Sequence, residues 1–274
     1  MTTERDTITA LARRTRAHTL RMVHQAKSSH IGSCFSMTDL LAALYGAVLR
    51  VDPRRPDWPE RDRFILSKGH AAAALYATLA ECGFFPVDWL ETYCRDGSRL
   101  AGHVTHHGVP GVDMSSGSLG HGLSLACGMA LAARADRQPW RTFVLLSDGE
   151  CDEGSTWEAA LFAPHHRLDN VVAVVDYNKI QSFGAVADVL GLEPFADKWR
   201  AFGWAVREID GHDVDQILDT FRGVTFETGR PSCVIGHTIK GKGVTFMESR
   251  LEWHYRSPDA AQLGQALAEL GACA

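Results

Sequence analysis

The sequence predicts an α/β fold in which a parallel sheet carries helices on both faces. Residues 142–147 (TFVLLS) and 170–176 (NVVAVVD) are continuous apolar runs, which is typical of strands that are buried on both faces. Helix-like segments separate such runs, and strands that alternate with helices form parallel sheets with right-handed crossovers. The 274 residues contain no internal repeat and no linker-like segment, so a single domain over residues 1–274 is predicted.

The N-terminal part of the chain has a helical pattern. Apolar residues recur at helical spacing over about 5–27, which predicts an amphipathic helix. Residues 28–33 (SSHIGS) interrupt this pattern and are predicted to form a loop. A second, mostly buried helix is expected over 38–49, and the prolines between 52 and 59 indicate a surface loop.

From residue 63 onward, strands and helices alternate. The apolar run 63–67 ends in Lys-Gly-His and is followed by a helix-forming stretch over 71–80, which indicates strand, tight loop and helix. Residues 95–122 are rich in Gly, Ser and His and predict a long loop, and such loops are usually functional. The remaining predicted elements are helices over 123–135 and 155–166 and strands over 142–147, 170–176, 204–209 and 232–237.

Composition excludes several classes of protein. Lys plus Arg number 28 and Asp plus Glu 33, so the formal charge of −5 gives no reason to expect binding to nucleic acid or to an anionic membrane. No signal-peptide pattern opens the chain and no run of 18 apolar residues occurs, so a cytoplasmic protein is expected. The seven cysteines are odd in number and form no CxxC pair, which argues against a zinc site or a disulfide framework and for a reducing compartment.

Polar residues follow two of the predicted buried strands directly. Asp148-Gly149 ends the run 142–147, and Asn178 follows the run 170–176. The 30-residue separation is about the length of one βαβ unit, which would bring both strand ends to one edge of the sheet. A carboxylate and an amide oxygen there suit Mg²⁺ or Ca²⁺, with further ligands from water and a phosphate-bearing partner.

These residues also carry a family resemblance. Asp148-Gly149-Glu150, Glu153-Gly154 and Asn178-Lys179-Ile180 resemble the diphosphate-binding motif of thiamine-diphosphate enzymes. Other motifs appear in the order found in transketolases: Ser29-His30, Ser67-Lys68-Gly69-His70, Gly102-His103, Gly117-Ser118-Leu119-Gly120 and His254. The resemblance covers about residues 5–258 and only the family's N-terminal domain, the thiamine-diphosphate-binding (PP) fold. The chain is therefore similar to the N-terminal subunit of a split transketolase.

The resemblance implies a role for each matching residue. Metal ligands would be the side chains of Asp148 and Asn178 and the carbonyl of Ile180. Cofactor contacts would come from His70, Gly117, Ser118, Leu119, Asp148, Gly149, Glu153, Asn178, Ile180 and His254, with Glu153 at a subunit contact. The catalytic residues around the sugar carbons would be His30, His70, His103 and His254, because imidazole exchanges protons near neutral pH.

The resemblance further implies an incomplete site. Transketolases activate thiamine diphosphate with a Glu of the pyrimidine domain, and they bind sugar phosphates with Arg and Ser residues of that domain. A second subunit that carries the pyrimidine-binding and C-terminal domains is therefore expected, in an α2β2 heterotetramer that acts on sugars or sugar phosphates with thiamine diphosphate and Mg²⁺. The chain alone is expected to be inactive.

Other interpretations remain open from the sequence. The chain could belong to another thiamine-diphosphate enzyme, similar to deoxyxylulose-phosphate synthase or an E1 dehydrogenase subunit, or it could be a non-catalytic scaffold subunit. Taken singly, Asp148-Gly149 could be a turn and His30 or His70 a helix cap. Ser147, His121, Ser182 and Phe183 depart from the residues common in transketolases, which leaves the sugar undetermined.

Two glycine-rich segments imitate nucleotide-binding motifs. Residues 117–122 do not follow a predicted strand and lack the glycine spacing of the dinucleotide fingerprint. Residues 236–243 (GHTIKGKG) approach a P-loop but lack its closing Ser or Thr, although their end (KGKG) is familiar near the cofactor in split relatives. His103, His106 and His107 have no second ligand pair at zinc spacing.

Overall fold

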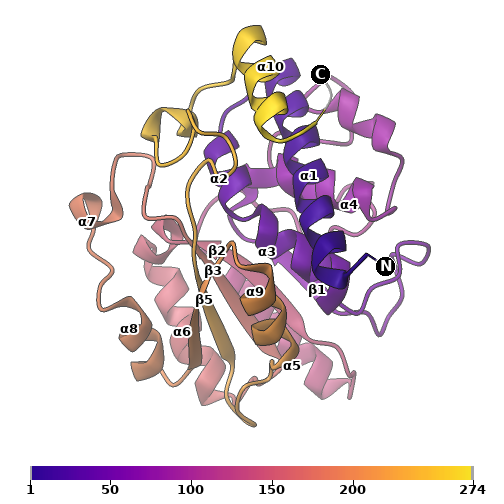
Figure 1. The fold of residues 1–274 in the computed structure, drawn as a ribbon. Coiled ribbons are helices and arrows are strands. Elements are labelled where there is room, and N and C mark those ends of the chain that lie inside the picture. Colours follow the sequence, from indigo (N-terminus) through magenta and orange to yellow (C-terminus); the bar gives the residue numbers. More distant parts are fainter. Residues whose placement is uncertain (1, 273–274) are drawn as a thin grey trace.

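A computed structural model of the protein, which describes residues 2–272, contains a five-stranded parallel sheet between two layers of helices (Figure 1). The strand order is β1-β2-β3-β5-β4, and every neighbouring pair is parallel. The strands are β1 (Arg63–Leu66), β2 (Thr142–Ser147), β3 (Val171–Tyr177), β4 (Ala205–Asp210) and β5 (Ser232–His237). The predicted α/β class is confirmed, and each predicted strand lies within one residue of its observed bounds.

Alternate residues of the strands enter two separate apolar cores. Phe143 and Leu145 of β2 pack in the first core, whereas Val144 and Leu146 pack in the second. The helices of the first core include α1 (Glu4–Ala26), α3 (Thr38–Ala43), α4 (Ala72–Glu81) and α9 (Val214–Arg222). Those of the second include α5 (Gly122–Ala135), α6 (Gly154–His165) and α8 (Phe195–Ala201), on the other face of the sheet (Figure 1). Both faces are covered, as the continuous apolar strands predict.

Local signals define the first helix, and two expectations nearby need correction. A capping box between Thr3 and Asp6 begins α1, and Lys27 ends it in the left-handed conformation (φ 48°). The loop expected over 28–33 is shorter, because α2 (Ile31–Ser36) begins within it and is buried throughout. The helix expected over 38–49 is α3 followed by a π-helical turn, η1 (Leu44–Val48).

Several elements had no counterpart in the sequence-based prediction. They are the 3-10 segments η3 (Val87–Thr92) and η5 (Leu251–His254) and the helices α7 (Val186–Val189), α8, α9 and α10 (Ala260–Glu269). Asp213 and Asp259 are the N-caps of α9 and α10, and their carboxylates accept hydrogen bonds from backbone N–H groups of the first turn. An Asp cap before an apolar-periodic run is the signal that would have found both.

The long loop predicted over 95–122 is confirmed, and hydrogen bonds hold it against the carboxyl end of β1. Val104 N donates to Gly69 O at 3.1 Å, and the Ser116 hydroxyl donates to Leu66 O at 2.5 Å. Gly69 must lack a side chain here, because a Cβ would lie 2.2 Å from Ser116 O. Within residues 2–272, no helix has the length and apolarity needed to cross a bilayer.

Candidate active site

The carboxyl ends of β2 and β3 bring the two predicted metal-ligand side chains together. Ser147 and Asp176 are paired in the sheet, so the residues that follow them emerge side by side. The Asp148 carboxylate accepts hydrogen bonds from Gly149 N at 2.7 Å and from Lys179 N at 2.6 Å. Asp148 is therefore tied directly to the residue next to Asn178, as the strand-end reasoning predicts.

A buried ion pair fixes the orientation of the Asn178 amide. The fully buried Asp176 carboxylate accepts a 3.1 Å hydrogen bond from Asn178 Nδ2, which leaves Oδ1 on the opposite side of the amide. Lys68, also fully buried, donates to Asp176 Oδ2 at 2.5 Å, and Ser36 Oγ donates to the same oxygen at 2.6 Å. Thr238 donates to the other oxygen of Asp176. With four donors around it, Asp176 has its pKa held below the usual range despite burial, chiefly by Lys68.

A lysine contacts the third predicted metal ligand. Lys240, which is 1% exposed, donates from Nζ to Ile180 O at 2.7 Å and to His254 Nδ1 at 2.8 Å. Burial lowers the pKa of Lys240 to about 8. The carbonyl oxygen of Ile180 is thus accessible to a cationic group from within the site.

The four predicted histidines lie together beside these residues. The ring centroid of His30 is 4.8 Å from that of His70, 4.9 Å from that of His254 and 6.4 Å from that of His103. The backbone of His30 has φ 72°, and its backbone N–H donates to the carbonyl oxygen of His254 at 2.7 Å. Neither His30 nor His70 caps a helix with its side chain, so the helix-cap interpretation of these two residues is not observed.

Burial keeps three of these imidazoles neutral near pH 7. It lowers the pKa of His30 to about 4 and that of His254 to about 3, and it holds the pKa of His70 well below the usual range. The neighbouring imidazoles and lysines act in the same direction. The Nδ1 atom of His30 is buried and has no hydrogen-bond partner within the described chain. A neutral imidazole with a free nitrogen can accept a proton from a substrate oxygen, and the imidazolium formed can then return it.

Glycine-rich backbone and Glu153 form the rest of the site. A Cβ on Gly117 would lie 3.3 Å from His103 Cδ2, so the loop passes directly over that ring. Leu119 and Glu153 line the cleft, and Glu153 precedes α6 at its N-terminus. Ser118 is exposed and does not line the cleft in this chain alone.

A cleft of about 290 Å³ is lined by eight of the predicted site residues, whereas His30, His103, Gly117 and Ser118 are not part of its lining. Its lining includes His70, Asp148, Gly149, Asn178, Ile180 and His254. Burial, with Asp176 nearby, raises the pKa of Asp148 to about 6, so a cation close to this carboxylate would relieve an unfavourable environment. Carboxylate, amide and carbonyl oxygens are the donors that Mg²⁺ prefers. The residues present therefore fit a Mg²⁺–diphosphate group.

Some cleft residues were not among the predicted site residues. Lys240, Ser33, Asp152 and Gln181 line the cleft, and Gln181 Nε2 donates to Asp152 Oδ2 at 2.8 Å. Lys240 follows β5 by three residues, at the same edge of the sheet as Asp148 and Asn178. The strand-end reasoning would have found Lys240 if it had been applied to β5 as well.

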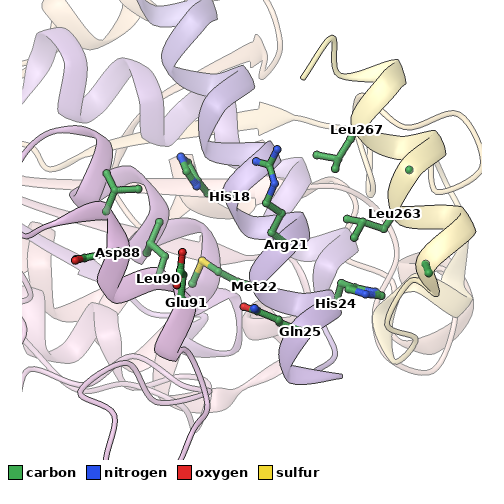
Figure 2. A pocket seen from close by; sticks show the side chains of 13 residues that line it. His18, Arg21, Met22, His24, Gln25, Asp88, Leu90, Glu91, Leu263 and Leu267 are labelled. Atoms are coloured by element: carbon green, nitrogen blue, oxygen red, sulfur yellow. The ribbon is translucent and has the colours of Figure 1, made fainter. Parts of the chain in front are cut away.

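A larger cavity lies away from this cleft. It measures about 720 Å³ and is formed by α1, η3 and α10 (Figure 2). Its apolar wall includes Met22, Leu90, Leu263 and Leu267, and Arg21 is part of the same lining. It contains none of the predicted site residues.

Comparisons with known proteins agree with this geometry. The family model described as "Transketolase, thiamine diphosphate binding domain" matches residues 7–272. The chain is 45% identical over 252 residues to a 6-deoxy-6-sulfo-D-fructose transketolase subunit of Clostridium sp. (strain MSTE9), with 92% of each chain covered. It is 42% identical over 265 residues to an apulose-4-phosphate transketolase subunit of Phocaeicola vulgatus, covering 97% of this chain and 94% of that protein.

Solved structures are similar over most of this chain. The transketolase from Leishmania mexicana superposes with a TM-score of 0.91 at 28% identity, covering 97% of this chain and 41% of that one. The Campylobacter jejuni transketolase gives a TM-score of 0.90 at 28% identity, covering 97% and 43%. The chain thus spans about two fifths of the length of these solved proteins.

Proposed function

The chain belongs to the transketolase family, and we propose that it is the N-terminal subunit of a two-component enzyme that transfers a two-carbon ketol unit between sugars. One observation carries the proposal: Asp148, Asn178, the Ile180 carbonyl and the predicted histidines converge on one edge of the sheet. The high coverage of relatives that are themselves named as subunits supports the two-component part.

The cleft residues divide into a metal set and a diphosphate set. Asp148, Asn178 and the Ile180 carbonyl would hold Mg²⁺, while His70, Gly149 and His254 would face the diphosphate. The Lys240 ammonium, now on the Ile180 carbonyl, would compensate the charge of the diphosphate. Backbone at Gly117, Ser118 and Leu119 would lie along the organic part of the cofactor. When bound, thiamine diphosphate supplies the electron sink for cleaving and forming the carbon–carbon bond.

The histidines would move protons at the substrate oxygens. His30, His70 and His254 are neutral near pH 7, so each can accept a proton from a substrate oxygen without first losing one to solvent, and the imidazolium formed can then return the proton. The Nδ1 of His30, which is buried without a partner in the described chain and belongs to a ring packed against His70 and His254, would be a hydrogen-bond partner for a hydroxyl or carbonyl of the sugar. His103, whose ring lies against the loop at Gly117 and 6.4 Å from the ring of His30, would belong to the same group.

A second subunit would cover the mouth of the cleft. Phe183 lines the cleft although its side chain is 83% exposed, and exposed apolar side chains follow it at Val189 and Leu190 and occur near His254 at Tyr255. Such an apolar rim around a polar site is typical of an interface. The partner would carry the pyrimidine-binding and C-terminal domains, contact Glu153 and form an α2β2 assembly. We place this enzyme in the cytoplasm, where the six described cysteines would stay reduced.

Titration calorimetry and a ketol-transfer assay test the proposal. The chain with its partner should bind thiamine diphosphate in the presence of Mg²⁺ and transfer a two-carbon unit from a ketose donor to an aldose. Asp148→Ala should weaken binding by at least about 100-fold, because a buried carboxylate ligand is lost, whereas Asp136→Ala, at an exposed site after α5, should leave it unchanged. No cofactor binding with the partner present would favour a scaffold role, and full activity of the chain alone would refute the need for a partner.

A further inference from the structure

A buried chain of hydrogen bonds leads from α1 to the backbone next to Lys240. Arg16 donates from both terminal nitrogens to the Asp39 carboxylate, at 2.9 and 2.7 Å. His212 Nδ1 lies 2.7 Å from Asp39 Oδ2, and Ile239 N donates to His212 Nε2 at 2.8 Å. The side chains of Arg16, Asp39 and His212 are only 8%, 11% and 11% exposed.

The direction of these bonds fixes the protonation of His212. A backbone N–H can only donate, so His212 Nε2, which accepts from Ile239, carries no proton. The proton of the neutral ring is then on Nδ1, where it is donated to the Asp39 carboxylate. An Asp–His pair arranged in this way offers one acceptor of fixed position to a backbone amide.

We propose that His212 is a positioning residue that holds the backbone beside Lys240, so that the Lys240 ammonium stays inside the cleft. This inference rests on the proposed function, in which Lys240 meets the cofactor diphosphate. His212 follows β4 in the segment Gly211-His212-Asp213, so it connects the edge strand with the end of the neighbouring strand β5.

Three consecutive residues after β5 each donate a hydrogen bond to a different part of the chain, and one of these bonds is the bond to His212. The Thr238 hydroxyl donates to Asp176, the Ile239 amide to His212, and the Lys240 ammonium to Ile180 O. Of these three bonds, the one from Ile239 holds the main chain through a side chain of another element. The backbone N–H of Gly241 then donates to Gly32 O at 3.0 Å. Without His212, the main chain between Thr238 and Gly241 would lose its central side-chain anchor.

Two substitutions of His212 separate its two hydrogen bonds. His212→Gln places an amide oxygen near the position of Nε2, so the acceptor for Ile239 N–H is kept. His212→Asn reaches only the position of Nδ1, so it keeps the donor to Asp39 and loses the acceptor. We expect His212→Asn to weaken binding of thiamine diphosphate with Mg²⁺ by about 10-fold, comparable to an omitted hydrogen bond, and His212→Gln to restore most of it. Calorimetry on the chain with its partner gives these affinities.

A double-variant cycle tests whether His212 acts through Lys240. In a Lys240→Met background, His212→Asn should produce less than a twofold further change, because the group that it positions is already absent. His237→Gln, on a partly exposed histidine paired with Glu208, is the matched control and should bind as the unaltered protein does. Thermal midpoints of all variants report whether the fold is intact.

The outcomes separate this inference from the proposed function. Failure of the unaltered protein to bind thiamine diphosphate would overturn the proposed function. Normal binding by the unaltered protein and by His212→Asn alike would overturn the positioning role alone. Equal losses for His212→Asn with and without Lys240 would also overturn it, because they would show an effect independent of Lys240. Nitrogen-15 shifts of the His212 ring provide a further readout, and a proton on Nε2 would contradict the proposed arrangement.

Discussion

Removing the charge of Lys68 should destabilise the whole domain. Lys68 and Asp176 are both fully buried and 2.5 Å apart, so Lys68→Met leaves a carboxylate inside the protein without its cation. Breaking a buried pair in this way costs about 3–5 kcal/mol. For a domain of this size, the loss corresponds to a fall of about 6–20 °C in the thermal midpoint.

The second variant in the series identifies the cause of the loss. Lys68→Met combined with Asp176→Asn removes the unpaired charge, so the double variant should recover about half of the lost stability. Lys242→Met is the matched control, because Lys242 is 34% exposed and lies 3.7 Å from Glu248. The control should cost less than about 1 kcal/mol, as is usual for exposed pairs. Urea denaturation followed by tryptophan fluorescence measures all three free energies of unfolding.

Two results would refute this reasoning. A loss below about 1 kcal/mol for Lys68→Met would show that the ion pair contributes no more than an exposed one. A double variant that is less stable than Lys68→Met would show that the unpaired Asp176 charge is not the cause. The hydroxyl donors to Asp176 would then hold the carboxylate sufficiently by themselves.

Three further predictions follow from the packing and electrostatics. Burial alone would raise the pKa of Asp39, but Arg16 holds it well below the usual range, so the folded state resists protonation. The free energy of unfolding should therefore fall below about pH 4, by up to about 1.4 kcal/mol per pH unit from this group, and Asp39→Asn should remove that slope in urea titrations. Phe183→Ser should weaken association with the partner by about 10-fold in calorimetry while leaving the thermal midpoint unchanged, because the side chain is 83% exposed; an unchanged affinity would exclude Phe183 from the interface. Gly69→Ala should lower the free energy of unfolding by about 1–3 kcal/mol, because the added Cβ would meet the 95–122 loop. Gly264→Ala in α10 is the control: its Cβ would meet nothing within 4 Å, so this variant should be slightly more stable. Equal effects of the two substitutions in urea denaturation would contradict the close approach at Gly69.

The sheet could be predicted from the sequence because its strands are buried on both faces. Continuous apolar runs at 142–147 and 170–176 have few alternatives to a central strand, and β2 and β3 lie there. The convergence of Asp148 and Asn178 follows from the same topology. The four histidines, in contrast, are brought together in the sequence only by the family resemblance, since their separations along the chain carry no geometric rule.

Other features depend on contacts that a linear pattern does not contain. The helix α2 begins at Ile31 in a segment with the composition of a loop, and its residues are buried by distant parts of the chain. Lys240 lies in a segment whose main sequence signal is its likeness to a P-loop, and its position becomes evident from the pairing of β5 with β3. His212 has a role only through Asp39 and Ile239, which are 173 and 27 residues away along the chain.

The strand order has a consequence for synthesis of the chain on the ribosome. Among the described strands, β4 pairs only with β5, although β5 is made after it and is inserted between β4 and β3. The nascent edge strand must therefore wait unpaired until residues 232–237 have left the exit tunnel. Lys240 emerges directly behind that strand, so the buried lysine of the cleft can reach its place only at about the moment when the sheet closes.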